Sequence, residues 1–226
     1  SPLLSNIMLN ELDKELERRG LPFVRYADDS MIFSKSKRAA MRVKESITRF
    51  IENALYLKVN KEKTVVSYVR GVKYLGYSFY VMKGKCQLTV HPKSKAKMKS
   101  RLKELTSRSN GWGHAKRKQK LKEYIKGWVG YYHLANMKRL LLETDEWLRR
   151  RIRMCIWKSW KRVKTKVANL IRCGISKHKA YEWGNTRKGY WRIADSYILH
   201  RAITKEHLCR AGYATLMGAY LEWYPK

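Results

Sequence analysis

The spacing of apolar residues before position 91 predicts a mixture of helices and short strands. Apolar residues first recur at helical spacing at Leu4, Ile7, Met8, Leu12 and Leu16. Two short apolar strands, residues 23–26 and 31–33, then flank Ala27-Asp28-Asp29, which predicts a hairpin turn. Ser36 can cap a second helix, and strand-like stretches follow at residues 64–69, 73–81 and 86–90. This order of elements indicates an α+β fold.

From position 92 onward the pattern predicts helices alone. Two of them are marked by Met98, Leu102 and Leu105, and by Leu121, Ile125 and Val129. A third runs through Leu148–Val163; we expect Thr144 to cap it and basic residues to cover its outer faces, namely Arg149, Arg150, Arg153, Lys158, Lys161 and Arg162. From about position 167 the chain predicts short helices rich in Trp and Tyr. The whole segment therefore predicts a helical bundle followed by a small helical tail.

The charge of the chain is strongly positive and unevenly distributed. Its 226 residues include 51 Lys and Arg against 18 Asp and Glu, a net charge of +33. Residues 1–90 hold 17 basic and 9 acidic groups, whereas residues 91–226 hold 34 and 9. Such an excess repels itself in a compact fold unless a polyanion neutralises it. It indicates nucleic acid as the partner, ahead of an anionic membrane surface or a ribosomal-type basic protein without chemistry.

Cysteine usage and hydropathy limit the other classes of function. The four cysteines are far apart and form no CxxC pair, which is typical of reduced cytoplasmic thiols. His200, His207 and Cys209 lack an evident fourth ligand, so we expect no zinc site. No apolar run approaches the ~20 residues that span a membrane, and no signal peptide is recognisable. We expect a cytoplasmic protein with no membrane partner, associated with the nucleoid in a bacterium.

Asp28 and Asp29 are the residues best suited to chemistry. Two adjacent carboxylates at a turn repel each other, and we expect no Lys or Arg at the turn itself. A bound Mg²⁺ would relieve this repulsion, because it accepts one or two carboxylates together with substrate phosphates. Pairs of such ions serve phosphoryl transfer. From the residues alone, an ordinary Asp-rich turn remains the alternative.

Four strings resemble, in order, the motifs of group II intron reverse transcriptases. SPLLSNIMLNELD (residues 1–13) is similar to the helix upstream of the active site, and FVRYADD (23–29) resembles the YADD hairpin. LKVNKEKT (57–64) resembles the L-x-x-N-x-x-K-T segment, and YLGY (74–77) resembles the F-L-G-[FY] primer grip, with Tyr for the commoner Phe. Strings at 125–132, 147–153 and 187–192 are similar to the thumb and the region after it. The chain is identified as the C-terminal portion of a bacterial, endonuclease-lacking group II intron-encoded reverse transcriptase/maturase.

The resemblance implies three domains and a set of site residues. Residues 1–91 would be the C-terminal part of the polymerase palm, 92–166 the thumb (maturase domain X), and 167–226 a basic, aromatic-rich DNA/RNA-binding domain. Asp28 and Asp29 would hold the catalytic Mg²⁺, with Lys63 nearby, while Leu75, Gly76 and Tyr77 would seat the primer. The implied nucleic-acid contacts are Lys126, Trp128, Tyr131, Tyr132, Arg149, Arg150, Arg153, Arg187, Lys188, Trp191 and Arg192.

The implied activity is RNA-directed DNA synthesis combined with binding of intron RNA to assist splicing and mobility. Its partners would be group II intron RNA, a template–primer duplex and a DNA target. The family's third metal carboxylate and its fingers belong to an upstream segment of the same protein, so we expect this chain alone to be inactive. The alternatives are a maturase without polymerase activity and a retron or CRISPR-associated reverse transcriptase. The Asp28-Asp29 pair favours a polymerase, and the long thumb with its aromatic tail favours the intron family.

Overall fold

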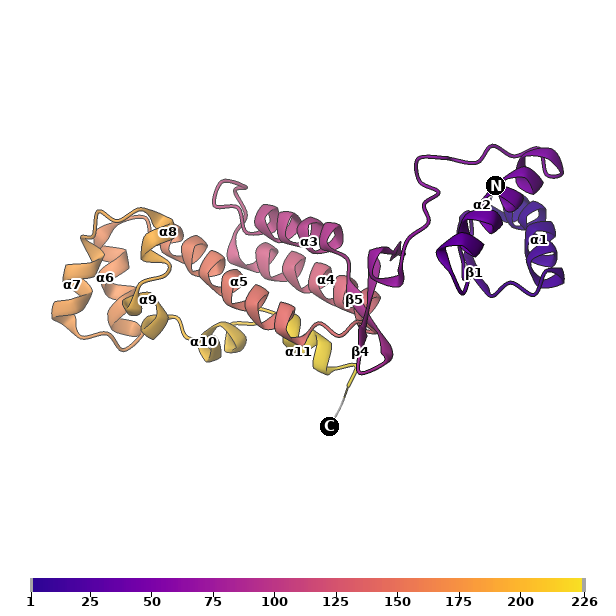
Figure 1. Cartoon of the computed structure of the whole chain (residues 1–226). Helices are drawn as coiled ribbons and strands as arrows, with labels where there is room; N and C mark the ends of the chain where they lie inside the picture. The colour runs from indigo at the N-terminus through magenta and orange to yellow at the C-terminus, as the bar shows by residue number, and fades with distance from the viewer. Residues whose placement is uncertain (1, 225–226) are drawn as a thin grey trace. The chain divides into compact units, whose positions relative to one another are not determined.

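A computed structural model describes residues 2–224 of the chain (Figure 1). Ser1 of the first motif, together with Pro225 and Lys226, lies outside the described residues. The chain divides into two compact units, Ser1–Gln87 and Leu88–Lys226, which are described separately. The described elements are mostly helices with two small antiparallel sheets, which agrees with the predicted α+β class.

The first unit begins with two helices that cover a β-hairpin. Its elements are α1 (Pro2–Arg18), β1 (Phe23–Tyr26), β2 (Asp29–Ile32) and α2 (Lys37–Asn53). Leu12 and Leu16 of α1 are buried with Ile47 of α2, and apolar side chains of both strands pack against them. Ser36 caps α2 as predicted, accepting a hydrogen bond from the Ala39 amide. The apolar stripe of α1 is buried only in its second half, because Leu3, Leu4, Ile7 and Met8 are exposed.

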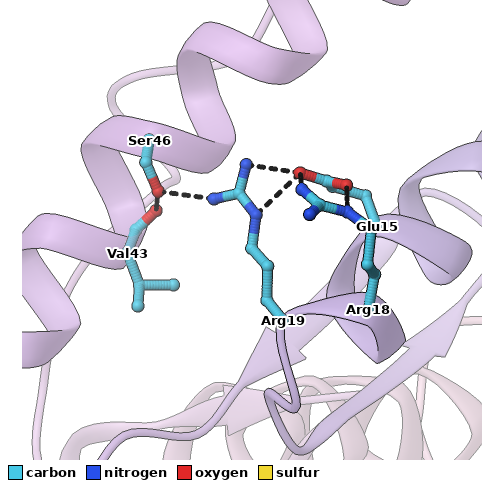
Figure 2. Close-up of polar contacts among 5 residues, drawn as sticks. All are labelled: Glu15, Arg18, Arg19, Val43 and Ser46. Carbon is cyan, nitrogen blue, oxygen red and sulfur yellow. Dashed lines mark hydrogen bonds and ion pairs between the residues drawn. The ribbon is translucent and has the colours of Figure 1, made fainter.

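A polar contact also joins the two helices of this unit. Figure 2 shows Arg19, which directly follows α1, bonded both to Glu15 of that helix and to Ser46 of α2. The Arg19 Nη1–Ser46 Oγ distance is 2.8 Å, and Ser46 Oγ in turn donates to the Val43 carbonyl at 3.2 Å. Glu15 accepts from Arg18 as well, so both of its carboxylate oxygens are occupied. Arg19 therefore links the end of α1 to the middle of α2.

The rest of the first unit differs from the prediction in two places. The strand expected at residues 64–69 is absent, because Thr64 bonds back to the Asn60 carbonyl and a single turn, η1 (Val69–Gly71), follows. The strand expected at 73–81 is broken by a turn at Leu75-Gly76 into β3 (Lys73–Tyr74) and β4 (Tyr77–Met82). β5 (Lys85–Val90) completes a sheet in the order β3-β4-β5 and leads the chain into the second unit.

The second unit is built on three long helices with smaller ones around them. The long helices are α3 (Pro92–Leu105), α4 (His114–Tyr132) and α5 (Lys138–Ser159), and the short ones are α6 (Val163–Arg172), α7 (Lys177–Gly184), α8 (Tyr190–Ile193), α9 (Tyr197–Ala202), α10 (Lys205–Arg210) and α11 (Leu216–Leu221). Figure 1 shows α3 beside α4 and α5, with α11 against α4 and α5. Most of the predicted apolar positions are buried, including Met98, Leu102, Leu121, Ile125, Leu148 and Ile152. Val163 is an exception, because α5 ends at Ser159 and Val163 is 42% exposed at the start of α6, so the predicted end of the third helix is wrong. None of the described helices is long and apolar enough to cross a membrane.

The predicted start of the third long helix is wrong. α5 begins at Lys138, so Thr144 lies in its second turn and donates to the Leu140 carbonyl at 2.7 Å. Asp145 is 3% exposed and accepts from the amides of Leu216 and Met217 at 2.8 and 2.9 Å. It therefore satisfies the first turn of α11, a helix about seventy residues later, rather than its own helix. Burial raises the pKa of this carboxyl, against the opposing effect of the two hydrogen bonds.

Candidate metal site and nucleic-acid interface

The two aspartates lie on the tip of the first hairpin. β1 and β2 pair so that Tyr26 is opposite Asp29, which leaves Ala27 and Asp28 as a two-residue loop. β2 thus begins at Asp29, two residues earlier than predicted. Ala27 has φ of +52°, in the left-handed region that residues with a Cβ rarely adopt. Both carboxylates are exposed, and neither makes an ion pair with any described residue.

Arg25 is the basic residue that contacts this turn. Its guanidinium donates to the Ala27 carbonyl at 2.9 Å, so the expectation that no basic group lies at the turn is wrong. The same guanidinium binds Asp13 of α1 through two nitrogens at 2.8 and 2.5 Å, and Asn6 at 2.9 Å. The hydrogen bonds that Arg25 donates to the Asp13 carboxylate raise the pKa of Arg25. Because its charge is paired with Asp13, Arg25 supports the turn without neutralising Asp28 or Asp29.

Lys63 lies on a tight turn that is tied to α2. The Asn60 side chain accepts from the Lys63 amide at 3.1 Å, and Lys44 Nζ donates to the Thr64 carbonyl at 2.6 Å. The conspicuous Asn and Thr of the LKVNKEKT string therefore shape the backbone, while the Lys63 side chain is exposed. Among the described contacts, none joins Lys63 to the aspartates.

The YLGY string forms a second tight turn in the same unit. Leu75 and Gly76 connect β3 to β4 with φ of +48° and +80°, and Tyr74 pairs with Tyr77. Positive φ at both central residues is the geometry that closes a two-residue hairpin. The Tyr74 hydroxyl is buried and has no hydrogen-bond partner among residues 2–224. Burial raises its pKa first, and the negative charge of Asp29 raises it further, so Tyr74 is within electrostatic reach of the metal-site candidate.

The sequence-predicted contacts of the second unit are in different environments. On α4, Lys126 and Tyr131 are exposed, while Trp128 and Tyr132 are half-buried with ring centroids 4.7 Å apart. Arg149 is half-buried and makes no hydrogen bond to any described residue. Arg187, Lys188, Trp191 and Arg192 are exposed near α8.

Two of the predicted arginines are engaged by the protein itself. Arg150 pairs with Asp195 at 2.9 Å and stacks on the Trp191 ring at 3.9 Å. Arg153 is only 5% exposed and donates to the Ile203 carbonyl at 2.9 Å, so its expected place on an outer face is wrong. A helix that carries basic residues at almost every position from 149 to 153 must turn some of them inward, because its period is 3.6 residues.

Sequence reasoning missed the residues that hold these sites in place. Arg25, Asp13 and Asn6 all lie inside the quoted motifs, but their mutual contacts were not foreseen. The sequence contained a signal for the role of Arg25. Arg25 lies two residues after Phe23 and therefore on the same inward face of β1, where a charged side chain needs a partner. Arg151 was also missed: it donates to Thr106 Oγ1 at 2.6 Å and to the Lys103 carbonyl at 3.0 Å.

A hairpin that presents two carboxylates without ion pairs among the described residues, and a helical unit with a large positive charge, fit a protein that acts on nucleic acid. Residues 1–79 match the model of the family described as reverse transcriptase (RNA-dependent DNA polymerase), and residues 95–174 match that of the group II intron maturase-specific domain. The chain belongs to the group II intron reverse transcriptases/maturases, of which it carries a C-terminal portion. These domains bind intron RNA and nucleic-acid substrates, and reverse transcriptases use divalent metal ions. No curated protein matches the sequence.

Proposed function

We propose that the first unit is the metal-binding part of the palm and that the second unit contains the thumb, residues 92–166, and a basic tail, residues 167–226. The observation that carries this proposal is the exposed Asp28-Asp29 pair, whose neighbouring cation is already bound to Asp13. Two adjacent carboxylates without a neutralising cation repel each other, and a bound divalent cation would relieve that repulsion. In this assignment Lys63 lies near the reacting phosphates, and the Leu75-Gly76-Tyr77 turn contacts the primer.

The donor set fits Mg²⁺ in part. Asp28 and Asp29 supply hard carboxylate oxygens on a fixed hairpin, which suits an ion that takes one or two carboxylates along with waters and phosphates. The described residues contain no cluster of three potential ligands. It is the family resemblance that gives the third carboxylate to an upstream segment of the same protein. When bound, the ions would stabilise charge on the attacking and leaving oxygens. Arg25 would keep the two carboxylates at the tip of the hairpin by holding Ala27.

The second unit is proposed to grip the template–primer duplex and the intron RNA, and to contact the DNA target. It holds 34 Lys and Arg against 9 acidic residues. Its described residues form four ion pairs between a Lys or Arg and a carboxylate. Most of its positive charge is therefore left for phosphate groups, which dominate affinity for nucleic acid. We place this function in the cytoplasm, on the nucleoid of a bacterium.

The decisive test uses the enzyme completed with its upstream segment. Asp28→Asn or Asp29→Asn should abolish RNA-templated primer extension and leave affinity for the template–primer unchanged within about twofold, because affinity comes from phosphate contacts elsewhere. Glu11→Gln is the matched control, since it removes an exposed carboxylate of the same unit that pairs with Lys14 and not with the residues of the hairpin tip, and it should leave activity near the wild-type level. The chain of 226 residues alone should extend no primer. Wild-type extension by either tip variant would refute the metal assignment.

A further inference from the structure

The aromatic rings of the tail differ in how far they are buried or covered by other side chains. Tyr213 and Tyr220 are buried. The Trp191 ring is covered by Arg150, and the Trp223 ring stacks on His133 with centroids 4.2 Å apart. Tyr197, at the start of α9, is 54% exposed, and its ring makes a T-shaped contact with Trp183, with centroids 5.4 Å apart. Lys179 Nζ lies over the same ring, 5.8 Å from its centroid, so the exposed part of the Tyr197 ring is available for stacking beside this cation.

Tyr197 also lines a cavity where the end of α6, the start of α7 and α9 meet. The cavity has a volume of about 410 Å³, and its wall combines three isoleucines, one aromatic ring and two cations: Ile171, Ile175, Ile198, Tyr197, Lys179 and Arg201. This volume is at the small end of the ~300–1,000 Å³ that ligand sites occupy. A flat group the size of one base fits such a space, and a duplex does not.

The electrostatics of the cavity favour an anion. No Asp or Glu lines it. Among the described residues, neither Lys179 nor Arg201 makes an ion pair, and Lys179 Nζ lies 5.8 Å from the centroid of the Tyr197 ring. Asp195, the acidic residue nearest to Tyr197 in sequence, pairs with Arg150 and His200, and Glu182, three residues from Lys179, does not line the cavity. A purely apolar ligand would leave both cations without a partner, so the wall fits a flat apolar group that carries a phosphate.

We propose that this cavity receives one unpaired nucleotide of a nucleic acid bound along the second unit. The base stacks on Tyr197 among the isoleucines, and the adjoining phosphate binds Lys179 and Arg201. Stacking on an aromatic side chain tolerates any base, so the site selects an unpaired nucleotide rather than a sequence. The inference rests on the proposed function, namely that the second unit binds nucleic acid. An RNA bulge and a DNA bulge present the same chemistry.

The test measures binding of the full chain to a fully paired RNA duplex and to the same duplex with one bulged purine, and repeats both with DNA. The wild-type chain should prefer the bulged form by about fivefold or more, the effect expected from one stacked base. Tyr197→Leu should abolish this preference and leave the paired duplex within about twofold. Tyr197→Phe should retain it, because the ring and not the hydroxyl makes the contact. Lys179→Gln with Arg201→Gln should weaken the bulged form more than the paired one.

Tyr181→Leu is the matched control. Tyr181 is 53% exposed on α7, close to the exposure of Tyr197, but lies outside this cavity, so its loss should leave the preference intact. A 2-aminopurine placed at the bulge should lose fluorescence on binding wild-type chain and keep it with Tyr197→Leu. Affinity for the paired duplex reports the proposed function, whereas the ratio of bulged to paired affinity reports this inference. A ratio of one in the wild type, or an unchanged ratio in Tyr197→Leu, would overturn this inference. A preference seen with RNA alone or with DNA alone would support it and show which nucleic acid supplies the unpaired nucleotide.

Discussion

Arg25 is the residue on which the tip of the hairpin depends most directly. Its planar guanidinium has donors in several directions, and here they reach Asp13, Asn6 and the Ala27 carbonyl at once. A cation that instead paired with Asp28 would neutralise the carboxylate that a metal needs. The ion pair with Asp13 prevents this, because it fixes the guanidinium on the α1 side of the hairpin.

Arg25→Lys should destabilise the first unit, because a single ammonium cannot reproduce the two-nitrogen contact with Asp13 and the bond to Ala27 together. We expect a loss of about 1–2 kcal/mol, allowing for partial solvent exposure of the pair. The eight tryptophans all lie between residues 112 and 223, so hydrogen exchange of residues 2–53 is the suitable measurement. Arg18→Lys is the control, since the Arg18 side chain is 71% exposed and should change protection little. Equal protection in the two variants would contradict a supporting role for Arg25.

Glu15 gives the first unit a dependence on acid pH. Hydrogen bonds from Arg18 and Arg19 lower the pKa of this carboxyl from 4.5 to about 2. A carboxyl with a depressed folded-state pKa stabilises the fold fully above its unfolded pKa and loses that contribution as the pH falls through the folded value. Protection of α1 should therefore fall between about pH 4.5 and 2, and Glu15→Gln should show a smaller fall over the same window. A wild-type pH profile in Glu15→Gln would mean that the contacts of Figure 2 do not persist in solution.

At the scale of elements, α5 organises the second unit by placing charges at the ends of other helices. Asp145 binds the first amides of α11. Arg151 binds carbonyls at the end of α3, and Arg153 binds the carbonyl of Ile203, which follows α9. On α4, Lys118 binds the carbonyl of Ala211, which follows α10. Each charge opposes the partial charge of the helix end that it contacts, and each satisfies groups that the helix cannot satisfy itself.

Close packing between α6 and α7 depends on Gly184. A Cβ at this position would lie 2.6 Å from Val167 Cγ2, and Val167 is buried and stiff about χ1. Gly184→Ala should therefore destabilise the second unit by about 1–2 kcal/mol, since overpacking outweighs the better helix propensity of alanine. Urea unfolding followed by tryptophan fluorescence measures this unit alone.

Gly127→Ala is the matched control for this packing. Gly127 is also helical, on α4, but a methyl group added there would meet no atom within 4 Å, so the change should stabilise by about 0.5–1 kcal/mol. Adding Val167→Ala should relieve the contact made by Gly184→Ala and recover part of the loss. If Gly184→Ala is as stable as Gly127→Ala, α6 and α7 are not in close contact.

For the whole molecule, the dominant property is the separation of charge between the two units. The first unit has an ordinary charge balance, with a salt bridge and an aspartate pair at its hairpin. The second carries +25 of the total net charge of +33, and its described residues neutralise little of it internally. Affinity for structured RNA should therefore come from the second unit and fall steeply with salt, by about 10³ or more between 50 and 200 mM for 6–10 phosphate contacts.

Substitutions of Arg149 and Arg153, which lie on the same helix, should distinguish contact with phosphate groups from support of the fold. Arg149→Ala should flatten the log–log salt slope by about 0.7–0.9 and leave the unfolding midpoint unchanged. Arg153→Ala should lower stability by about 1–3 kcal/mol, because the buried Ile203 carbonyl loses its donor, and leave the slope of the folded protein unchanged. An unchanged slope in Arg149→Ala would show that Arg149 belongs to a merely solvated face, and an unchanged unfolding midpoint in Arg153→Ala would show that its bond to the Ile203 carbonyl gives no structural support.

The sequence by itself determined the local features of this protein. Apolar periodicity and capping residues act over a few positions, so they predicted α2, the first hairpin and the buried faces of α3, α4 and α5. Ordered motifs identified the family and the aspartate pair, because chemistry requires particular side chains at particular spacings.

Only the tertiary structure decided which charged groups are free. Asp145 carries the chemistry of a helix cap, yet it caps a helix that lies about seventy residues away. Arg25, Arg150 and Arg153 look equally basic in sequence, but carbonyls and carboxylates from distant segments occupy them, while Arg149 stays without such a partner. The partner of a charge is set by proximity in space, and a long-range contact leaves no periodic trace along the chain.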